Sequence, residues 1–204
     1  MRKALVLDTP DINAFLTSSD IVDYQSAIIK DAATSLSGGT HGEIELAKKA
    51  YEFVRDNIAH SIDIGGNIVT WRASDVLKHK QGICYAKAHL LAGILRCLGI
   101  PAGFCYQKLV FSDDEEKPRL VLHGLNVLYL KSLGAWFRLD ARGNKEGVNA
   151  EFSLEEEKLA FPVRKEFGEE DIHVIYASPN KNVVNALKAS KSVSELISNL
   201  PSEL

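Results

Sequence analysis

The sequence contains no apolar run that approaches the roughly 20 residues needed to cross a bilayer. The stretch from Met1 to Asp8 is too short to hold the apolar core of a secretory signal peptide. Positive charge is not in excess, because 24 Lys and Arg residues are set against 27 Asp and Glu residues. These absences argue against membrane insertion and against binding to phosphate backbones. We therefore expect a cytoplasmic protein with no membrane or nucleic-acid partner.

Cysteine is also scarce. The three cysteines, Cys84, Cys97 and Cys105, form an odd set without zinc-knuckle spacing, which suits reduced thiols better than a disulfide framework. No Gly-Lys-Ser/Thr or Gly-x-Gly-x-x-Gly pattern accompanies Gly65-Gly66, and nothing in the sequence resembles a calcium loop. We expect no bound metal and no organic cofactor.

The composition itself is that of a soluble globular protein, with 46% hydrophobic and 25% charged residues among 204. This length suits one substantial core. We expect a single domain over residues 1–204, with a helical lead-in at 1–39, a core at about 40–150 and a helical extension at 151–204. Apolar residues recur at helical spacing from Ile21 to Leu36 and from Ile44 to Ile58. Thr40 and Glu43 predict a capping box at the start of the second helix.

The stretch from Gln81 to Pro101 organises the chain. Nearly every residue from 86 to 98 is apolar, and Gly99 and Pro101 end the run, which predicts a buried helix about four turns long. Gly82 permits a tight turn just before it, so Cys84 falls in the first helical turn. Unpaired backbone N–H groups there favour a thiolate. The alternative is that Cys84 is one more small apolar residue of a buried helix.

After Pro101 the apolar period changes to that of strands. Strands are expected at 103–111, 120–130 and 135–140, separated by an acidic turn at 112–118 and a loop at 131–134. Residues 172–176 predict an edge strand. Short helical patterns from 183 to 200 are compatible with packing on the core or with formation of a homo-oligomer. Helices followed by an antiparallel meander predict an α+β fold, in which the central buried helix packs on an antiparallel β-sheet with flanking N- and C-terminal helices.

Two of these strands bring an imidazole and a carboxylate together. The loop at 131–134 would pair Leu130 with Ala135, which sets Leu125 opposite Asp140 and His123 one diagonal step away. A register shifted by two would place His123 directly opposite Asp140. In either register both side chains share one face of the sheet. If the central helix packs on that face, Cys84 can meet His123, which gives a nucleophile, a base and an orienting carboxylate.

The other histidines fit such a site less well. His89 lies five positions beyond Cys84 on the same helix and is rotated about 140° away from it. The rest lack a carboxylate placed by a hairpin, and we expect them to be exposed or merely hydrogen-bonded. These are His41, His60, His79 and His173.

Three motifs in order carry a family resemblance. They are Gly82-x-Cys84 followed by Leu95-Arg-x-Leu-Gly-Ile-Pro101, then His123-x-x-Asn126-x-x-Tyr129, then Trp136-x-x-Leu139-Asp140. Together they resemble the core of the transglutaminase-like superfamily over about residues 44–141. The resemblance implies a papain-like α+β core with Cys84, His123 and Asp140 as nucleophile, base and orienter. The chain departs from the family at Gly124-Leu125, where Ala-Trp is usual, and at Ala141-Arg142, where Pro-Thr often stands.

The reaction that the resemblance implies is acyl transfer on a peptide or protein amide through a thioester on Cys84. Water as acceptor would make the chain a protease, deamidase or amidase, and a primary amine would make it a transglutaminase. The Cys84 N–H would hold the oxyanion, with Gln81 as a candidate second donor. Candidates for the substrate groove are Trp71, Tyr85, Gly124, Asn126 and Trp136, although core packing explains the tryptophans equally well.

A second hypothesis comes from a different class of function. The chain could be a non-catalytic transglutaminase-like protein that serves as a binding or scaffold module, since a fold does not by itself guarantee activity.

Overall fold

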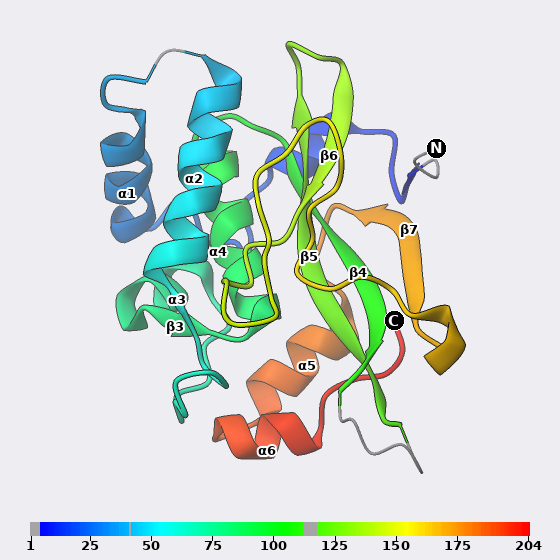
Figure 1. The fold of residues 1–204 in the computed structure, drawn as a ribbon. Coiled ribbons are helices and arrows are strands. Elements are labelled where there is room, and N and C mark those ends of the chain that lie inside the picture. Colours follow the sequence, from blue (N-terminus) through cyan, green and yellow to red (C-terminus); the bar gives the residue numbers. More distant parts are fainter. Residues whose placement is uncertain (1–4, 41, 112–117) are drawn as a thin grey trace.

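The computed structural model describes residues 5–40, 42–111 and 118–204 (Figure 1). His41 and most of the acidic turn expected at 112–118, up to Lys117, lie outside the described residues. The helices are α1 Ala27–Ser37, α2 Glu43–Asn57, α3 Ala73–His79, α4 Cys84–Cys97, α5 Lys181–Ala189 and α6 Val193–Ser198, with 3-10 turns at Ile12–Leu16 and Lys165–Phe167. The strands are β1 Val6–Leu7, β2 Ala59–His60, β3 Gln81–Gly82, β4 Ala102–Val110, β5 Leu120–Leu130, β6 Ala135–Leu139 and β7 Glu170–Tyr176.

The main sheet has the strand order β1-β7-β4-β5-β6. The run β4, β5, β6 is an antiparallel meander, as the sequence predicts, and the mixture of helices with this meander confirms the α+β class. β7 is antiparallel to β4 and parallel to β1. The strand expected at 172–176 is therefore present as β7. The prediction that it forms the edge of the sheet was wrong, because the two-residue β1 pairs with its outer side.

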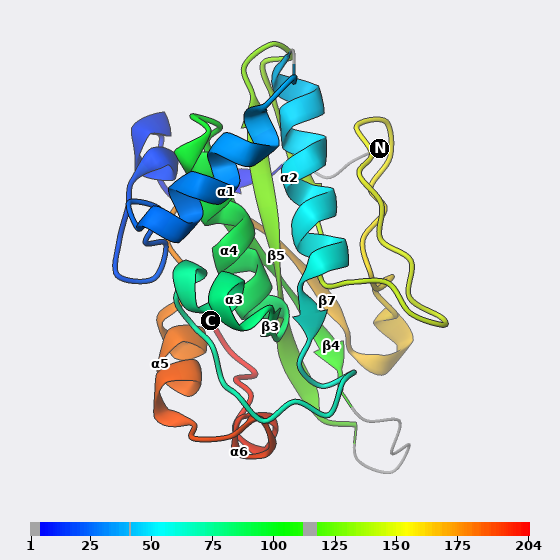
Figure 2. The ribbon, with the colours of Figure 1, turned by 90° about the vertical axis from the view of Figure 1, so that its left-hand side faces the viewer.

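Helix α4 lies at the centre of the molecule. In Figures 1 and 2, α1, α2 and α3 cover one side of α4 and β5 runs along the other, which explains why the helix is apolar around most of its circumference. Gly82 allows this close packing, because a Cβ atom there would lie 2.9 Å from the Ala86 Cβ atom. In the described ranges no helix combines the length and the apolar character needed to cross a membrane.

Helix α1 begins six residues later than the apolar pattern predicts. The Ser19 hydroxyl accepts the N–H groups of Ile21 and Val22 and holds them in a turn. The next carboxylate, Asp23, accepts the Ser74 N–H at 2.9 Å in the first turn of α3. The stretch expected to open a helix therefore anchors α3 against α1.

The start of α2 also differs from the capping box expected of Thr40 and Glu43. The N-cap is Gly42, and the Glu43 carboxylate instead accepts the N–H groups of Lys131 and Ser132, each at 3.0 Å. These bonds tie α2 to the loop between β5 and β6. Burial tends to raise the pKa of Glu43, but the bonds from this loop lower it overall.

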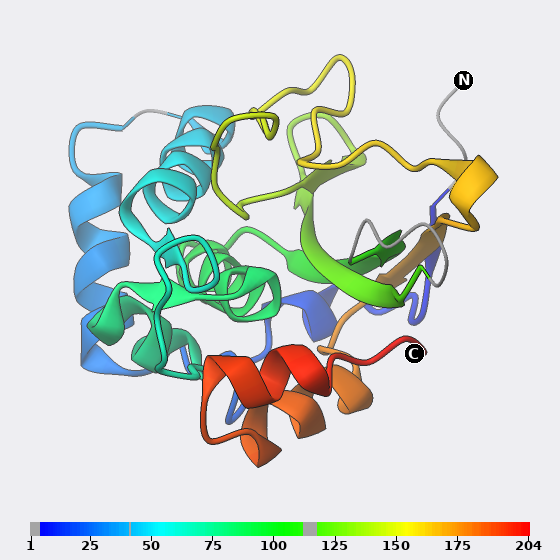
Figure 3. The same cartoon turned by 60° about the horizontal axis from the view of Figure 1, so that its bottom comes forward.

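The C-terminal helices fold back onto the core. Figure 3 shows α5 and α6 beneath α4 and the sheet, and Val183, Leu187 and Leu196 belong to the main hydrophobic core. Ser192 caps α6 by accepting the Glu195 N–H at 3.2 Å, as its spacing predicts. The apolar stripe of these helices is therefore used within the chain.

The two faces of β5 have different partners. Asn126 and Leu128 face α4, since the Asn126 amide donates to the Ala88 carbonyl oxygen at 2.9 Å and Leu128 is part of the core around α4. Leu125 and Val127 face a second apolar cluster on the other side of the sheet. Alternation along the strand places His123 on this second face. The central helix thus packs on the face opposite to the one that carries His123.

Candidate active site

The site is built where β6 ends. β6 pairs with β5 from Leu130–Ala135 to Asn126–Leu139, which confirms the first of the two predicted registers. Asp140 follows directly, outside the ladder, and its Oδ2 atom accepts a hydrogen bond from the His123 Nε2 atom at 2.8 Å. The hairpin thus brings the imidazole and the carboxylate together.

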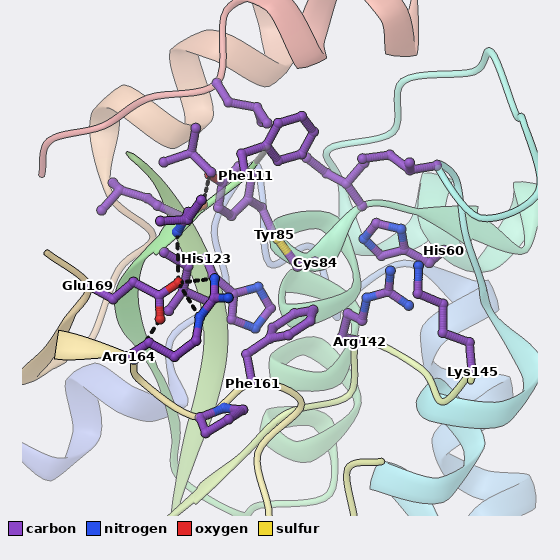
Figure 4. A pocket seen from close by; sticks show the side chains of 18 residues that line it. His60, Cys84, Tyr85, Phe111, His123, Arg142, Lys145, Phe161, Arg164 and Glu169 are labelled. Atoms are coloured by element: carbon purple, nitrogen blue, oxygen red, sulfur yellow. Dashed lines mark hydrogen bonds and ion pairs between the residues drawn. The ribbon is translucent and has the colours of Figure 1, made fainter. Parts of the chain in front are cut away.

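Cys84 reaches His123 at the open edge of β5. Because β6 stops at Leu139, no strand in the described part of the chain pairs with this edge beyond Asn126. The first turn of α4 lies there instead, and the Tyr85 hydroxyl donates to the Leu122 carbonyl oxygen. Cys84 and His123 line the same cavity (Figure 4), and the proximity of Cys84 helps to raise the pKa of His123. Cys84 therefore approaches His123 from the edge of the sheet. The strand pattern predicts instead that α4 packs on the face that carries His123.

The electrostatics of this group favour a charged imidazole. Burial by itself lowers the pKa of His123, but Asp140 and Cys84 outweigh it and raise the pKa to about 10. Burial raises the pKa of Asp140, yet His123 and the N–H groups of Ala160 and Arg142, each 3.1 Å from the carboxylate, hold it below its usual value. Since Nε2 of His123 is bound to Asp140, Nδ1 is the atom left to exchange a proton with the thiol.

Phe161 covers the imidazole. Its ring meets the His123 ring edge-on, with centroids 5.2 Å apart, and the Arg142 guanidinium lies 5.8 Å from its centroid. Phe161 comes from the segment between β6 and β7, which must cross the sheet because these strands lie near its opposite edges. No periodic pattern in the sequence marks this crossing, so its contribution to the site was missed.

The cavity beside Cys84 has a volume of about 580 Å³, within the range typical of small-molecule sites. Apolar side chains form part of its wall: Leu109 from β4, Phe111 just after β4, Val121 from β5 and Leu200 from the C-terminal tail. The tail is held in place because the Pro201 carbonyl oxygen accepts the Leu122 N–H at 2.7 Å. The open edge of β5 is thus partly filled by the end of the described chain.

His60 lies on the other side of Cys84 from His123 (Figure 4). β2 pairs with β3 in parallel, His60 with Gly82, which fixes this histidine just ahead of α4. Burial, followed by the positive charge of Arg142, lowers the pKa of His60 to about 3, so its ring is neutral near pH 7. Its Nδ1 atom is buried without a hydrogen-bond partner. The expectation that His60 is exposed or merely hydrogen-bonded was wrong, because a two-residue strand is too short to be recognised in a sequence.

Two predicted polar site residues serve the scaffold instead. The Gln81 side chain is directed at Gly66, where a Cβ atom would lie 2.3 Å from its Oε1 atom, rather than into the cavity. The Asn126 amide is fully buried and donates to the carbonyl oxygens of Ala88 and Gly103, joining α4 to the sheet.

Both tryptophans also lie away from the cavity. Trp71 is covered by two cations, Arg72 at 4.6 Å and Lys188 at 4.5 Å from its ring centroid. Trp136 packs against Phe15 on the face opposite α4, with centroids 4.8 Å apart. Neither one forms a wall of the groove, so packing explains both.

Tyr85 lines the cavity as expected, and Gly124 lies directly behind it. A Cβ atom at Gly124 would approach the Tyr85 ring to 2.7 Å. Gly124 therefore acts on the groove through the position of Tyr85.

The remaining cysteines take no part in the site. Cys105 is fully buried in the second apolar cluster and Cys97 is half-buried near the end of α4. Across the described ranges, His, Cys, Asp and Glu side chains form no group of three that could hold a metal ion.

The family model described as the transglutaminase-like superfamily matches residues 30–141. A solved structure of a candidate cysteine protease from Cytophaga hutchinsonii aligns with a TM-score of 0.52 at 22% identity, covering 66% of this chain and 43% of that one. The periplasmic domain of TgpA from Pseudomonas aeruginosa gives 0.47 at 17% identity, with 62% and 46% covered. Red sea bream transglutaminase gives 0.40 at 13% identity, with 63% and 27% covered.

The chain spans less than half the length of each of these three structures. No curated protein matches it in sequence. The Cytophaga structure supports the fold, and the family match covers more than half of the residues. On this evidence the chain belongs to the transglutaminase-like superfamily.

Proposed function

We propose that this protein is a cysteine-dependent acyl-transfer enzyme that acts on amide bonds of peptides or proteins. Cys84 is the nucleophile, His123 the general acid and base, and Asp140 the residue that orients the imidazole. The observation that carries the proposal is the position of His123, which is bound to Asp140 at 2.8 Å and lies beside the Cys84 thiol in an open cavity.

In the first step the Cys84 thiolate attacks the amide carbonyl carbon. A C–S bond forms, and the carbonyl electron pair moves to oxygen. The Cys84 N–H can donate to this oxyanion, since it lies in the first turn of α4, where no side chain caps the helix. His60 takes the place of Gln81 as the second donor, because a neutral imidazole that lines the cavity can polarise a carbonyl group.

The intermediate then collapses. The C–N bond breaks, and the His123 imidazolium gives its proton to the departing nitrogen, which leaves a thioester on Cys84. An incoming water or amine attacks the thioester and passes its proton to His123. The Cys84 thiolate departs, and the product is a carboxylic acid or a new amide.

Acylation of Cys84 by p-nitrophenyl acetate tests this chemistry without knowledge of the natural substrate. We expect one acetyl group on Cys84 by intact-mass and peptide-mass spectrometry, with an initial burst of p-nitrophenol equal in amount to the acetylated protein. The Cys84→Ala protein should lack the adduct, and His123→Ala should form it much more slowly. Acetylation spread equally over the three cysteines would contradict the proposal and favour the binding or scaffold hypothesis.

The acceptor is tested separately. A glutamine-containing peptide is incubated with the protein, with and without a primary amine, and the products are weighed. Conversion of glutamine to glutamate indicates hydrolysis, and coupling of the amine indicates transamidation. Loss of both products in Cys84→Ala assigns them to this site.

A further inference from the structure

A cationic rim lies on one side of the cavity, formed by Arg142 and Lys145 with Asp63 between them. The Arg142 guanidinium donates to both Asp63 carboxylate oxygens, to Oδ2 and, at 2.8 Å, to Oδ1. The Lys145 ammonium donates to Asp63 Oδ1 at 3.0 Å. Arg142 and Lys145 both line the cavity that contains Cys84 (Figure 4).

The charges of this rim do not cancel. Two cations share the single carboxylate of Asp63, and the neighbouring His60 is neutral near pH 7 because burial lowers its pKa. The opposite wall is balanced, since Arg164 pairs with Glu169 at 2.7 Å. A positive surplus thus stands beside Cys84 in a chain whose formal net charge is -3. A local field of this sign attracts anions.

The rim is also held rigidly. The backbone groups of Lys145 and Val148 exchange two hydrogen bonds, at 3.0 and 2.9 Å, which fixes the turn that carries the ammonium group. Asn144 and Ala150 close the base of this loop, and the Arg55 guanidinium binds the Ala150 carbonyl oxygen at 3.1 Å from α2. A cation fixed in place before the ligand arrives loses little entropy on binding.

Lys145 has donors to spare. Its ammonium group has three N–H donors, of which the bond to Asp63 uses one, and its side chain is half-exposed. Arg142 is largely buried, and each of its two terminal nitrogens already donates to Asp63, so it contributes mainly charge. A ligand would therefore bind chiefly to Lys145, in the field of both cations.

We propose that the amide substrate carries a carboxylate group that binds at the Arg142–Lys145 rim while the amide lies at Cys84. This inference rests on the proposed function and narrows its substrate class. The carboxylate could be the α-carboxylate at the end of a peptide or the side chain of an acidic residue. Both offer the same oxygen atoms to the rim.

Two small alkylating reagents test the charge preference directly. Iodoacetate carries a carboxylate where iodoacetamide carries a neutral amide. With either reagent the Cys84 thiolate displaces iodide and forms a C–S bond. We expect Lys145→Gln to lower the ratio of the iodoacetate rate to the iodoacetamide rate by roughly threefold to tenfold, the effect of one nearby charge. Lys145→Arg should keep the ratio. Lys48→Gln, which removes an exposed charge from α2, should also keep it.

The outcomes separate this inference from the proposed function. If iodoacetamide labels Cys84 selectively but Lys145→Gln leaves the ratio unchanged, the rim proposal is wrong and the acyl-transfer proposal stands. If neither reagent prefers Cys84 over Cys97 and Cys105, the proposed function fails and the rim proposal fails with it. A ratio that falls with added salt in the unaltered protein, but not in Lys145→Gln, supports the rim.

A matched pair of isomers identifies the source of the carboxylate. N-iodoacetyl-glutamine carries it at the α position and N-iodoacetyl-isoglutamine carries it on the side chain, and N-iodoacetyl-glutaminamide is the neutral reference. If one isomer labels Cys84 faster than the reference and loses this advantage in Lys145→Gln, the position of its carboxylate identifies the kind of carboxylate that the rim binds. If neither isomer exceeds the reference, carboxylate recognition is contradicted.

Discussion

His123 and Asp140 lie 2.8 Å apart, although the strand pairing between their segments ends before either residue is reached. The end of β6 at Leu139 has two effects. It frees Asp140 to turn its carboxylate toward the imidazole, and it leaves an open edge on β5 where the first turn of α4 brings Cys84. One strand terminus therefore assembles three side chains from separate parts of the chain.

Asp140→Asn should abolish most of the acylation of Cys84 by p-nitrophenyl acetate. The buried carboxylate accepts bonds from His123, Arg142 and Ala160, and an amide replaces one acceptor oxygen with a donor. We expect a rate loss of up to about 10⁴-fold, as found where an orienting aspartate is replaced in a catalytic triad. The unfolding free energy should fall by about 1–3 kcal/mol, measured by urea denaturation.

The control for this variant is Asp31→Asn on the exposed face of α1. This control should change neither the acylation rate of Cys84 nor the unfolding free energy. An Asp140→Asn protein that folds normally and keeps full acylation would show that the carboxylate does not orient His123.

His60→Phe should lower kcat for p-nitrophenyl acetate by roughly 10²–10³-fold with little change in KM, because one donor to the oxyanion is lost. His60→Gln keeps an N–H donor and should recover part of the rate. Alkylation by iodoacetamide forms no oxyanion, so it should be unchanged in both variants. Equal losses of acylation and alkylation would mean that His60 has only a structural role.

Gly124→Ala should disturb the cavity from behind. The added methyl group would approach the Tyr85 ring to 2.7 Å and push it from the position in which its hydroxyl binds Leu122. We expect a loss of about 1–3 kcal/mol in unfolding free energy, together with slower acylation of Cys84. Gly38→Ala, where the new Cβ atom has room, is the matched control. Unchanged stability in Gly124→Ala would show that Tyr85 is not confined there.

The stability of the protein should fall between pH 6.5 and pH 4, in part through His89. Burial lowers the pKa of His89 from 6.5 to about 4, although its Nδ1 atom is bound to the Trp71 carbonyl oxygen at 2.7 Å. In this range the unfolded chain binds a proton that the folded chain does not, so stability decreases as pH falls. The full shift corresponds to about 3 kcal/mol.

The measurement is the unfolding free energy against pH for the unaltered protein and for His89→Gln. The variant should show a shallower slope, whatever its absolute stability. His60 acts in the same direction from pH 6.5 down to about pH 3, so its contribution is common to both proteins. His123, whose pKa is raised, is protonated in both states below pH 6.5 and adds no slope. Parallel curves would contradict the assignment to His89.

The local parts of the fold could be predicted from the sequence. The extent of α4 follows from its apolar run, and the pairing of Leu130 with Ala135 follows from the length of the loop between them. The layer to which each element belongs could not be predicted in the same way. β7 pairs with β4 across more than 60 residues of intervening chain, and no local pattern encodes that contact.

In the candidate site, too, the residues in local patterns could be predicted and those placed by long-range contacts could not. Cys84, His123 and Asp140 stand at positions that helix and hairpin patterns mark, so the sequence brings them to notice. His60 and Phe161 enter the site through a two-residue strand and an irregular crossing, which have no periodic signature. Gln81 was placed wrongly because its nearness to Cys84 in sequence does not fix the direction of its side chain, which faces Gly66.

The central claim is that His123 activates Cys84, and the rate of iodoacetamide alkylation against pH tests it most directly. Cys84 should react well below pH 8.5, the ordinary range of a free thiol, and His123→Ala should lose this advantage. Cys105 and Cys97 are internal references, since burial raises the pKa of both thiols. Slow labelling of all three cysteines at one common rate, unchanged in His123→Ala, would contradict the account.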